Sequence, residues 1–259
     1  MEVSTIEQYS GLDLASVNAV PLRVLVTGFG SFPGTRDNPT ALLVHALGGH
    51  RARLARLGVE LETDVLPVNY AEVARKLEEL DETLKPDAIL HFGLAARRKF
   101  FSIETRALNR LSLVHCDASG ARAGRLAIIP GAPHVAKSTF PYRQIEAAFR
   151  REGLRGRLSA NAGDYVCNEA LYLSLARSHA RAGFVHVPRL ARANRPKKAS
   201  RGTRPNLGDV IRAGLIAILA VARKLRHDLA KDRNAMSAHH TFVKRQAKGP
   251  ELDPALSMP

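Results

Sequence analysis

The strongest constraint on the fold is an alternation of short apolar segments with amphipathic ones. Residues 21–26 (PLRVLV) form an apolar run that ends at glycine, and 60–68 and 87–94 are two further strand-like segments. Between the last two lies 70–85, a charged stretch with helical spacing that is closed by Pro86. Because parallel strands are joined by crossover helices, this β-α-β order predicts a single α/β/α sandwich domain with a twisted, mainly parallel central sheet.

The remaining elements follow the same rhythm. Asn38 is placed to cap a helix that has Pro39 in its first turn, continues to about residue 50 and restarts to Arg56. Downstream we expect a short strand or edge segment at 125–131, a helix at 141–153, a strand or turn at 156–167, a helix at 168–183 with a Gly183 stop, a strand at 183–188 and a helix at 204–227.

The periodicity also predicts the domain boundaries. Residues 1–20 are polar and aperiodic, which is typical of an N-terminal extension. Periodicity is lost again after about Asp228, so we expect a flexible C-terminal tail at 227–259. One domain, residues 21–226, remains between them.

Cysteine content and apolar runs suggest where the protein works. Two cysteines, Cys116 and Cys167, do not make the disulfide framework of a secreted domain, and no signal peptide is evident. We therefore expect a cytoplasmic protein. The longest apolar run, 213–222, is shorter than the roughly 20 residues that span a bilayer, so it predicts a buried helix and no membrane partner.

The net charge of +15 favours an anionic partner such as a nucleic acid. The chain has no helix-turn-helix, zinc-finger or RNA-recognition signature, and only 5% of its residues are aromatic. A nucleic-acid-binding protein is thus a remote alternative, and we expect no nucleic-acid partner. The basic residues concentrate at 191–205, which we interpret as a solvated surface loop or as a segment that attracts acidic peptides to a site.

A glycine loop follows the first strand. Gly28, Gly30 and Gly34 miss the G-x-G-x-x-G spacing of a dinucleotide site by one residue, and no P-loop motif is present. The loop also carries Phe29 and Phe32. These are either core residues or the apolar wall of a small-ring pocket at the carboxyl end of a parallel strand, where open α/β sheets bind ligands.

Three residues could form a nucleophilic site. Cys167 precedes a helix expected at about Asn168, and the helix N-terminus favours the reactive thiolate and offers N–H groups for an oxyanion. His186 on strand 183–188 could serve as the base and Glu104 could orient it. Each has a structural alternative: a buried small residue, a core histidine and a solvated carboxylate.

Other cysteine and histidine residues do not suggest a second site. Cys116 follows His115, but adjacent strand residues point to opposite faces, so we interpret this cysteine as structural. No H-E-x-x-H or C-x-x-C motif is present, and we expect neither a metal nor a cofactor.

Four segments together resemble pyroglutamyl peptidase I, also called pyrrolidone-carboxylate peptidase, a family of intracellular cysteine peptidases. They occur in family order and are VTGFGSF with NPT, HFGLAARRKFFSIETRALN, LSANAGDYVCN and AGFVHVP, within about residues 22–225. The resemblance implies hydrolysis of an N-terminal pyroglutamyl residue from peptides through a thioester, without a cofactor. It also implies an α/β/α fold and a homo-oligomer, a dimer or tetramer.

The resemblance implies residue roles as well. Cys167 matches the family nucleophile, His186 its general base and acid, and Glu104 the acidic member of the triad. Substrate contacts are implied for Phe29 and Phe32, which match the ring-sandwiching phenylalanines, and for Asn38, Leu94 and Tyr165.

This sequence also departs from the family pattern. Thr105 and then Arg106 follow the glutamate where the family usually has a basic residue directly after it. Asn161 replaces a small or hydroxyl residue, and Leu94 stands where some members carry glutamine. These departures keep open an alternative function, a non-catalytic or repurposed member of the fold that binds modified N-termini.

Overall fold

The computed structural model describes residues 20–32, 34–35, 38–191 and 204–247, with side chains through Asn234. In chain order the elements are β1 (Leu22–Phe29), α2 (Pro39–Gly48), α3 (Arg51–Arg56), β2 (Val59–Leu66), α4 (Tyr70–Leu84), β3 (Ala88–Leu94), β4 (Phe101–Glu104), β5 (Arg106–Leu108), β6 (Val135–Lys137), α5 (Tyr142–Arg151), β7 (Gly156–Ser159), α6 (Val166–Arg177), β8 (Arg181–Val187) and α7 (Leu207–Ala247).

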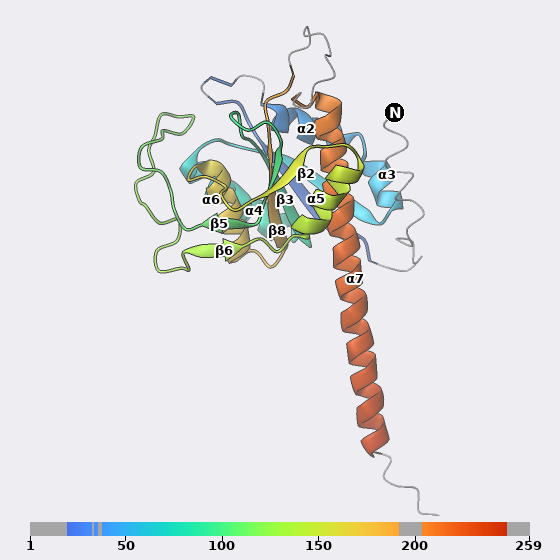
Figure 1. Ribbon diagram of the computed structural model, residues 1–259. Helices are drawn as coiled ribbons and strands as arrows, with labels where there is room; N and C mark the ends of the chain where they lie inside the picture. Colours follow the sequence, from blue (N-terminus) through green and yellow to red (C-terminus); the bar gives the residue numbers. More distant parts are fainter. Residues whose placement is uncertain (1–19, 33, 36–37, 192–203, 248–259) are drawn as a thin grey trace, which may run out of the picture. The chain divides into compact units, whose positions relative to one another are not determined.

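A six-stranded sheet in the order β2-β1-β3-β8-β4-β7 is the centre of the fold (Figure 1). The strands β2, β1, β3 and β8 are mutually parallel. Strand β4 runs antiparallel to β8, and β7 runs parallel to β4, so the last two strands are reversed. The predicted α/β fold with a mainly parallel sheet is confirmed.

Different helices cover the two faces of the sheet. On one face, α4 and α6 share a buried apolar cluster with Leu25, Ile89 and Phe184 of the sheet. On the opposite face, Gly28 leaves room for the backbone of Thr40, so that α2 lies close against β1. The first part of α7 packs on α2 at that same face.

The helix starts follow from local sequence. The Asn38 side chain accepts a hydrogen bond from the Thr40 N–H, with Pro39 in the first turn, as predicted. The Asn69 side chain accepts hydrogen bonds from two N–H groups in the first turn of α4. This helix ends at Leu84, before Pro86, again as predicted.

Residues 125–131 contain no strand, contrary to the prediction. The side chain of Asn109 donates hydrogen bonds to the carbonyls of Ile129 and Ala132 and accepts one from the Ile129 N–H. Ile128 is buried in the core cluster. The apolar run is therefore a loop held by one asparagine, and the strands nearby are β5 and β6, which form a separate antiparallel pair.

Two helix ends were also predicted wrongly. Helix α6 ends at Arg177, and Gly183 lies inside β8, where an added Cβ would collide with the ring of Phe140. This glycine makes room for a neighbour and does not end a helix. Helix α7 continues to Ala247, well past the expected end at 227, because polar helix formers sustain it without an apolar pattern.

The chain divides into two compact units, Met1–Ala222 and Arg223–Pro259. The division into an extension, a domain and a tail stays a prediction, and nearly all of the predicted extension lies outside the described residues, as does most of the 191–205 segment. Within the described part of the chain, no helix has the length and apolarity needed to cross a bilayer.

Candidate active site

His186 lies near the carboxyl end of β8, between two other strands. Its backbone is in register with Gly93 of β3 on one side and with Ser102 of β4 on the other. The side chain is 6% exposed. Its neighbours on β3 and β4 therefore determine the surroundings of the imidazole.

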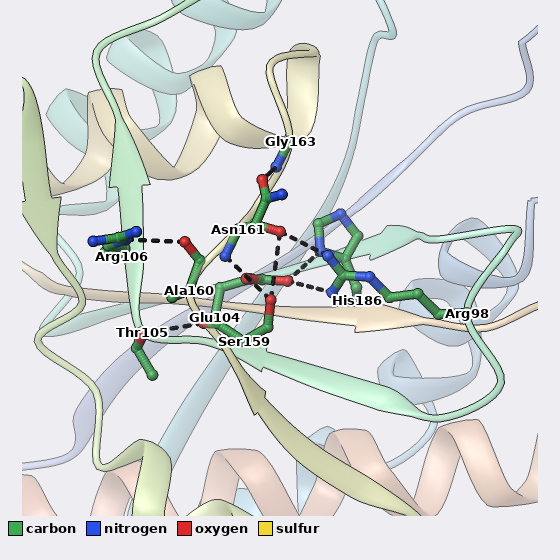
Figure 2. A network of polar contacts seen from close by, with 9 residues as sticks. All are labelled: Arg98, Glu104, Thr105, Arg106, Ser159, Ala160, Asn161, Gly163 and His186. Carbon is green, nitrogen blue, oxygen red and sulfur yellow. Dashed lines mark hydrogen bonds and ion pairs between the residues drawn. The ribbon is translucent and has the colours of Figure 1, made fainter.

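Glu104 reaches His186 diagonally across the antiparallel pair β4–β8. It lies two residues beyond Ser102 on the same face of β4, which makes it a diagonal neighbour of His186. The Glu104 Oε1 atom is 2.8 Å from His186 Nδ1 (Figure 2). Because a carboxylate only accepts hydrogen bonds, Nδ1 carries the proton, and Nε2 is left as the basic nitrogen.

Arg98 binds the same carboxylate from the loop between β3 and β4. Its Nη1 donates to Glu104 Oε1 at 2.6 Å, and its Nη2 donates to the backbone carbonyl of Asn161 at 2.6 Å (Figure 2). The Glu104 side chain is fully buried and that of Arg98 is 26% exposed. The guanidinium thus compensates a buried negative charge from the edge of the site.

The two acid–base groups take complementary protonation states at neutral pH. Burial opposes ionisation of Glu104, but hydrogen bonding to His186 and further hydrogen bonds lower its pKa below the ordinary 4.5. Burial lowers the pKa of His186 below 6.5, although the hydrogen bond with Glu104 and its charge act in the opposite direction. An ionised carboxylate therefore faces a neutral imidazole that can accept a proton.

Cys167 lies in the first turn of α6, which begins at Val166, two residues earlier than predicted. Gly163, with φ of 87°, forms the turn that precedes the helix. A Cβ added at Gly93 would lie 2.8 Å from Cys167 Sγ and 2.5 Å from the ring of Phe184. The thiol thus lies directly over the glycine that neighbours His186.

The three chemical groups share one face of the sheet. The ring of Phe184 contacts the same space above Gly93 as the thiol, and it lies 4.6 Å, centroid to centroid, from the ring of His186. Glu104 and His186 are hydrogen bonded, whereas Cys167 makes no hydrogen bond to His186 within the described contacts. A nucleophile–base contact is often long in an empty site and tightens when substrate binds.

The pKa of Cys167 departs from the expectation based on the helix N-terminus. Burial, and secondarily the charge of Glu104, raise it from 9.0 to about 12, and Arg98 only partly offsets this. A helix dipole contributes about 0.3–1 kcal/mol, whereas this rise corresponds to roughly 4 kcal/mol. At neutral pH the thiol is therefore protonated, and it needs a base.

The two phenylalanines of the glycine loop differ in burial. Phe29, at the end of β1, is 2% exposed and lies 6.2 Å from Phe184, centroid to centroid. Phe32 is half-buried and packs against the same core cluster. Both therefore lie on the α4–α6 face that carries Cys167, and their contact with a substrate ring stays a prediction.

The other implied substrate contacts have partners within the protein. Asn38 is buried, and besides capping α2 it donates to the Gly30 carbonyl, which holds the glycine loop. The Tyr165 hydroxyl donates to the Cys116 carbonyl, and its ring meets that of Tyr70 edge-on. Leu94 ends β3 and is half-buried. Substrate contact by these three residues also stays a prediction.

Sequence reasoning did not identify four groups around the site: Gly93, Arg98, the Asn161 carbonyl and Asn168. Asn168 follows the nucleophile, is fully buried, and makes three hydrogen bonds to the backbone of Leu108 and Arg110. The basic run before Glu104 and a polar residue directly after the cysteine were the available signals.

The departures around Glu104 are accommodated by the backbone. Thr105 Oγ1 donates to the Ser159 carbonyl at 3.0 Å, and Arg106 Nε donates to the Ala160 carbonyl at 2.9 Å (Figure 2). In the described part of the chain, neither side chain forms a hydrogen bond or ion pair with Glu104 or His186. Both instead fasten β4 and β5 to the segment that leads from β7 to the nucleophile.

No second chemical centre is found among the side chains that the structure describes. They include no group of three or more His, Cys, Asp or Glu residues able to hold a metal ion. Cys116 is exposed and unpaired. A surface pocket lined by Arg23, Glu60 and Glu62 lies at the opposite end of β1 from Phe29 and carries none of the groups described above.

The comparisons with known proteins point to one family. The family model for pyroglutamyl peptidase matches residues 22–224. The pyrrolidone-carboxylate peptidase of Pyrococcus furiosus is 36% identical over 172 residues, which are 64% of this chain and 81% of that protein. Pyrrolidone-carboxylate peptidase 1 of Ralstonia nicotianae is 32% identical over 208 residues, 78% of this chain and 93% of that protein.

Solved structures show the same relationship. The crystal structure of pyrrolidone carboxyl peptidase from Thermus thermophilus aligns with a TM-score of 0.66 at 34% identity, covering 76% of this chain and 99% of that one. A mutant of the Pyrococcus furiosus enzyme aligns with a TM-score of 0.70 at 30% identity, covering 79% of this chain and 100% of that one. This chain belongs to the pyroglutamyl peptidase family.

Proposed function

We propose that this protein is a cysteine peptidase that removes the N-terminal pyroglutamyl residue from peptides. The observation that carries the proposal is the hydrogen bond between Glu104 and the buried imidazole of His186, with the Cys167 thiol over the adjacent Gly93. These are the groups that acyl transfer to a cysteine requires: a nucleophile, a base and an acid that orients the base.

In the first half of the reaction, Cys167 Sγ attacks the carbonyl carbon that links pyroglutamate to the next residue. Because the thiol is neutral, its proton passes to His186 Nε2 as the S–C bond forms. The first N–H groups of a helix have no partner within it, and Cys167 lies in the first turn of α6, so we assign these N–H groups to stabilise the oxyanion. The C–N bond then breaks, and His186 returns the proton to the departing amine.

In the second half, water hydrolyses the thioester. His186 takes a proton from the water as its oxygen bonds to the acyl carbon, and the S–C bond breaks. The proton then returns to Cys167, and pyroglutamate leaves. Throughout, the ionised Glu104 stabilises the imidazolium that forms twice in the cycle.

The substrate's terminal residue is an uncharged five-membered lactam without an α-ammonium group. Such a ring suits an apolar wall, and Phe32, which is half-buried beside the core cluster, is the residue we assign to it together with Phe29. Asn38, Leu94 and Tyr165 complete the proposed substrate contacts.

Replacement of the two cysteines tests the proposal with a matched control. Cys167→Ser should lower kcat for pyroglutamyl-β-naphthylamide by at least about 10⁴-fold, since loss of a catalytic nucleophile removes the covalent route. Cys116→Ser, at the exposed thiol, should leave kcat within about twofold of the wild type. Unchanged hydrolysis in Cys167→Ser would refute the assignment. Tight binding of a pyroglutamyl peptide without turnover in the wild type would establish the non-catalytic alternative.

We further propose that the protein works in the cytoplasm as a homo-oligomer and without a nucleic-acid partner. Two unpaired cysteines, one of them exposed, suit a reducing compartment. Light scattering coupled to size exclusion gives the oligomeric state, and a monomer at all concentrations would contradict the proposed assembly.

A further inference from the structure

The loop between β3 and β4 carries a cation whose place in the reaction no motif indicates. Arg98 bridges two parts of the site that are far apart in the sequence. One is the Glu104 carboxylate on β4, and the other is the Asn161 carbonyl in the segment between β7 and the nucleophile helix (Figure 2).

Each end of this bridge leads to one reacting group. Glu104 Oε1 accepts both from Arg98 and from His186 Nδ1, so the guanidinium and the imidazole share one carboxylate oxygen. At the other end, Asn161 Oδ1 accepts a hydrogen bond from the Gly163 N–H, in the turn that leads into α6. One planar side chain therefore ties the base and the nucleophile to a common frame.

We propose that Arg98 is a positioning residue of the proposed peptidase, a two-pronged clamp that fixes Glu104 and the 161–163 turn relative to each other. Through Glu104 it sets the orientation of His186, and through the turn it sets the entry of α6 and thus of Cys167. The inference rests on the proposed function for the identity of these groups.

The charge of Arg98 acts in the same place as its geometry. The charged groups that act on His186 are Glu104 from β4 and Arg98 from the preceding loop, and both also act on the Cys167 thiol of α6. The cation favours the ionised Glu104, the neutral His186 and the thiolate of Cys167. Removing it therefore raises the pKa of all three groups. The thiol releases its proton less readily, Glu104 is less fully ionised, and His186 stays protonated, and so unable to act as a base, up to a higher pH.

Arg106 offers a matched control. It also donates from a guanidinium to a backbone carbonyl, that of Ala160, one residue before the carbonyl that Arg98 binds. Among the residues that the structure describes, Arg106 forms no hydrogen bond or ion pair with Glu104 or His186. An effect due only to loss of a cation or of one carbonyl contact should therefore occur in both variants.

The experiment compares Arg98→Met, Arg98→Lys and Arg106→Met with the wild type, all in a Cys116→Ser background. Arg98→Met should lower kcat about 10- to 100-fold, which is the cost of one charge-assisted hydrogen bond, with KM changed less than about threefold. When kcat is plotted against pH, the acidic limb for Arg98→Met should lie at higher pH than that of the wild type, because His186 loses the nearby cation that lowers its pKa. Arg98→Lys keeps the positive charge but loses the pair of guanidinium donors. The acidic limb of its pH profile should therefore stay near that of the wild type, while kcat falls by a smaller factor than in Arg98→Met.

A second readout does not depend on peptide hydrolysis. Alkylation of Cys167 by iodoacetamide reports thiolate formation, and in Arg98→Met it should require higher pH than in the wild type. If the wild type fails to hydrolyse pyroglutamyl substrates, the proposed function fails, and this alkylation profile still decides the role of Arg98.

Three results would overturn the inference. The first is a kcat and an alkylation profile in Arg98→Met that match the wild type. The second is an equal loss in Arg106→Met, and the third is a rise in KM alone, which would make Arg98 a substrate-binding residue. If Arg98→Met does not fold, Arg98→Lys decides: wild-type kcat there shows that the two-pronged geometry is not needed.

Discussion

A single methyl group added at Gly93 should reduce catalysis strongly while lowering the stability of the fold only modestly. In Gly93→Ala, the new Cβ would lie 2.8 Å from Cys167 Sγ and 2.5 Å from the ring of Phe184. Both distances fall short of the roughly 3.5 Å at which non-bonded atoms attract best. The thiol must therefore move by about 0.7 Å and the ring by about 1 Å.

The two consequences differ in size. Overpacking of this kind costs about 1–3 kcal/mol of folding free energy, which lowers the Tm of a domain of this size by about 2–12 °C. A displacement of about 1 Å at reacting atoms can cost about 100-fold in rate. We therefore expect kcat/KM in Gly93→Ala to fall about 10- to 100-fold while the protein remains folded at room temperature.

Gly183→Ala is the matched control, since it also adds a methyl group to a crowded strand position. The added Cβ meets the Phe140 ring on the opposite face of the sheet, and β8 itself carries His186 three residues later. Its Tm should fall in the same range, with a smaller loss of activity. The assays are hydrolysis of pyroglutamyl-β-naphthylamide and thermal melting. Gly93→Ala with wild-type kcat/KM, or equal activity losses in both variants, would refute the placement of the thiol.

Three further predictions concern the catalytic carboxylate Glu104 and two buried residues near the start of α6, Asn168 and Glu169. Glu104→Gln keeps the shape but removes the charge beside His186, so kcat should fall by about 100- to 10 000-fold, and a loss under about tenfold would contradict the role of this carboxylate. Asn168→Ala leaves buried backbone groups beside β5 without partners and should lower the urea-derived free energy of unfolding by about 2–4 kcal/mol; a loss below about 1 kcal/mol would contradict this. Burial raises the pKa of Glu169 to about 7 from 4.5, so the folded state holds this proton more tightly and stability falls as pH rises between those values. Glu169→Gln should remove that slope and add about 3 kcal/mol at alkaline pH, whereas an unchanged slope would show that the carboxyl is not the cause.

Periodicity and caps were enough to predict most of the first half of the fold. The stretch 70–85 became α4 because its apolar residues recur at helical spacing and Asn69 and Pro86 mark its ends. The strand predicted at 125–131 was wrong because an apolar run can also be a loop that has one side in the core. Here the loop is held by hydrogen bonds to Asn109. A sequence window does not contain the distant asparagine, so the pattern alone predicted a strand.

The site residues were recognisable as types, but their electrostatics were not. The helix start predicted a reactive thiolate at Cys167, and burial gives the opposite result because it is several times larger than the dipole effect. The thiol lies over Gly93 of β3 and shares that space with the ring of Phe184 of β8, and neither residue is near Cys167 in the sequence. The sequence around Cys167 indicates the helix dipole that acts on the thiol, but it does not indicate how deeply the thiol is buried in the folded protein.

The direction of β4 explains how Glu104 comes to lie beside His186. It also explains why the sequence alone did not predict this contact. If β4 ran parallel to β8, as β3 does on the other side of that strand, the residues of β4 would pass His186 in the opposite order. Instead Ser102 lies opposite His186 and Glu104 opposite Phe184, while on its other edge Glu104 is in register with Ser159 of β7. A slip of one residue in either ladder would turn the carboxylate to the opposite face. The acid is therefore held by two ladders as well as by Arg98, and its position depends on pairings between segments that are 55 to 82 residues apart in the chain.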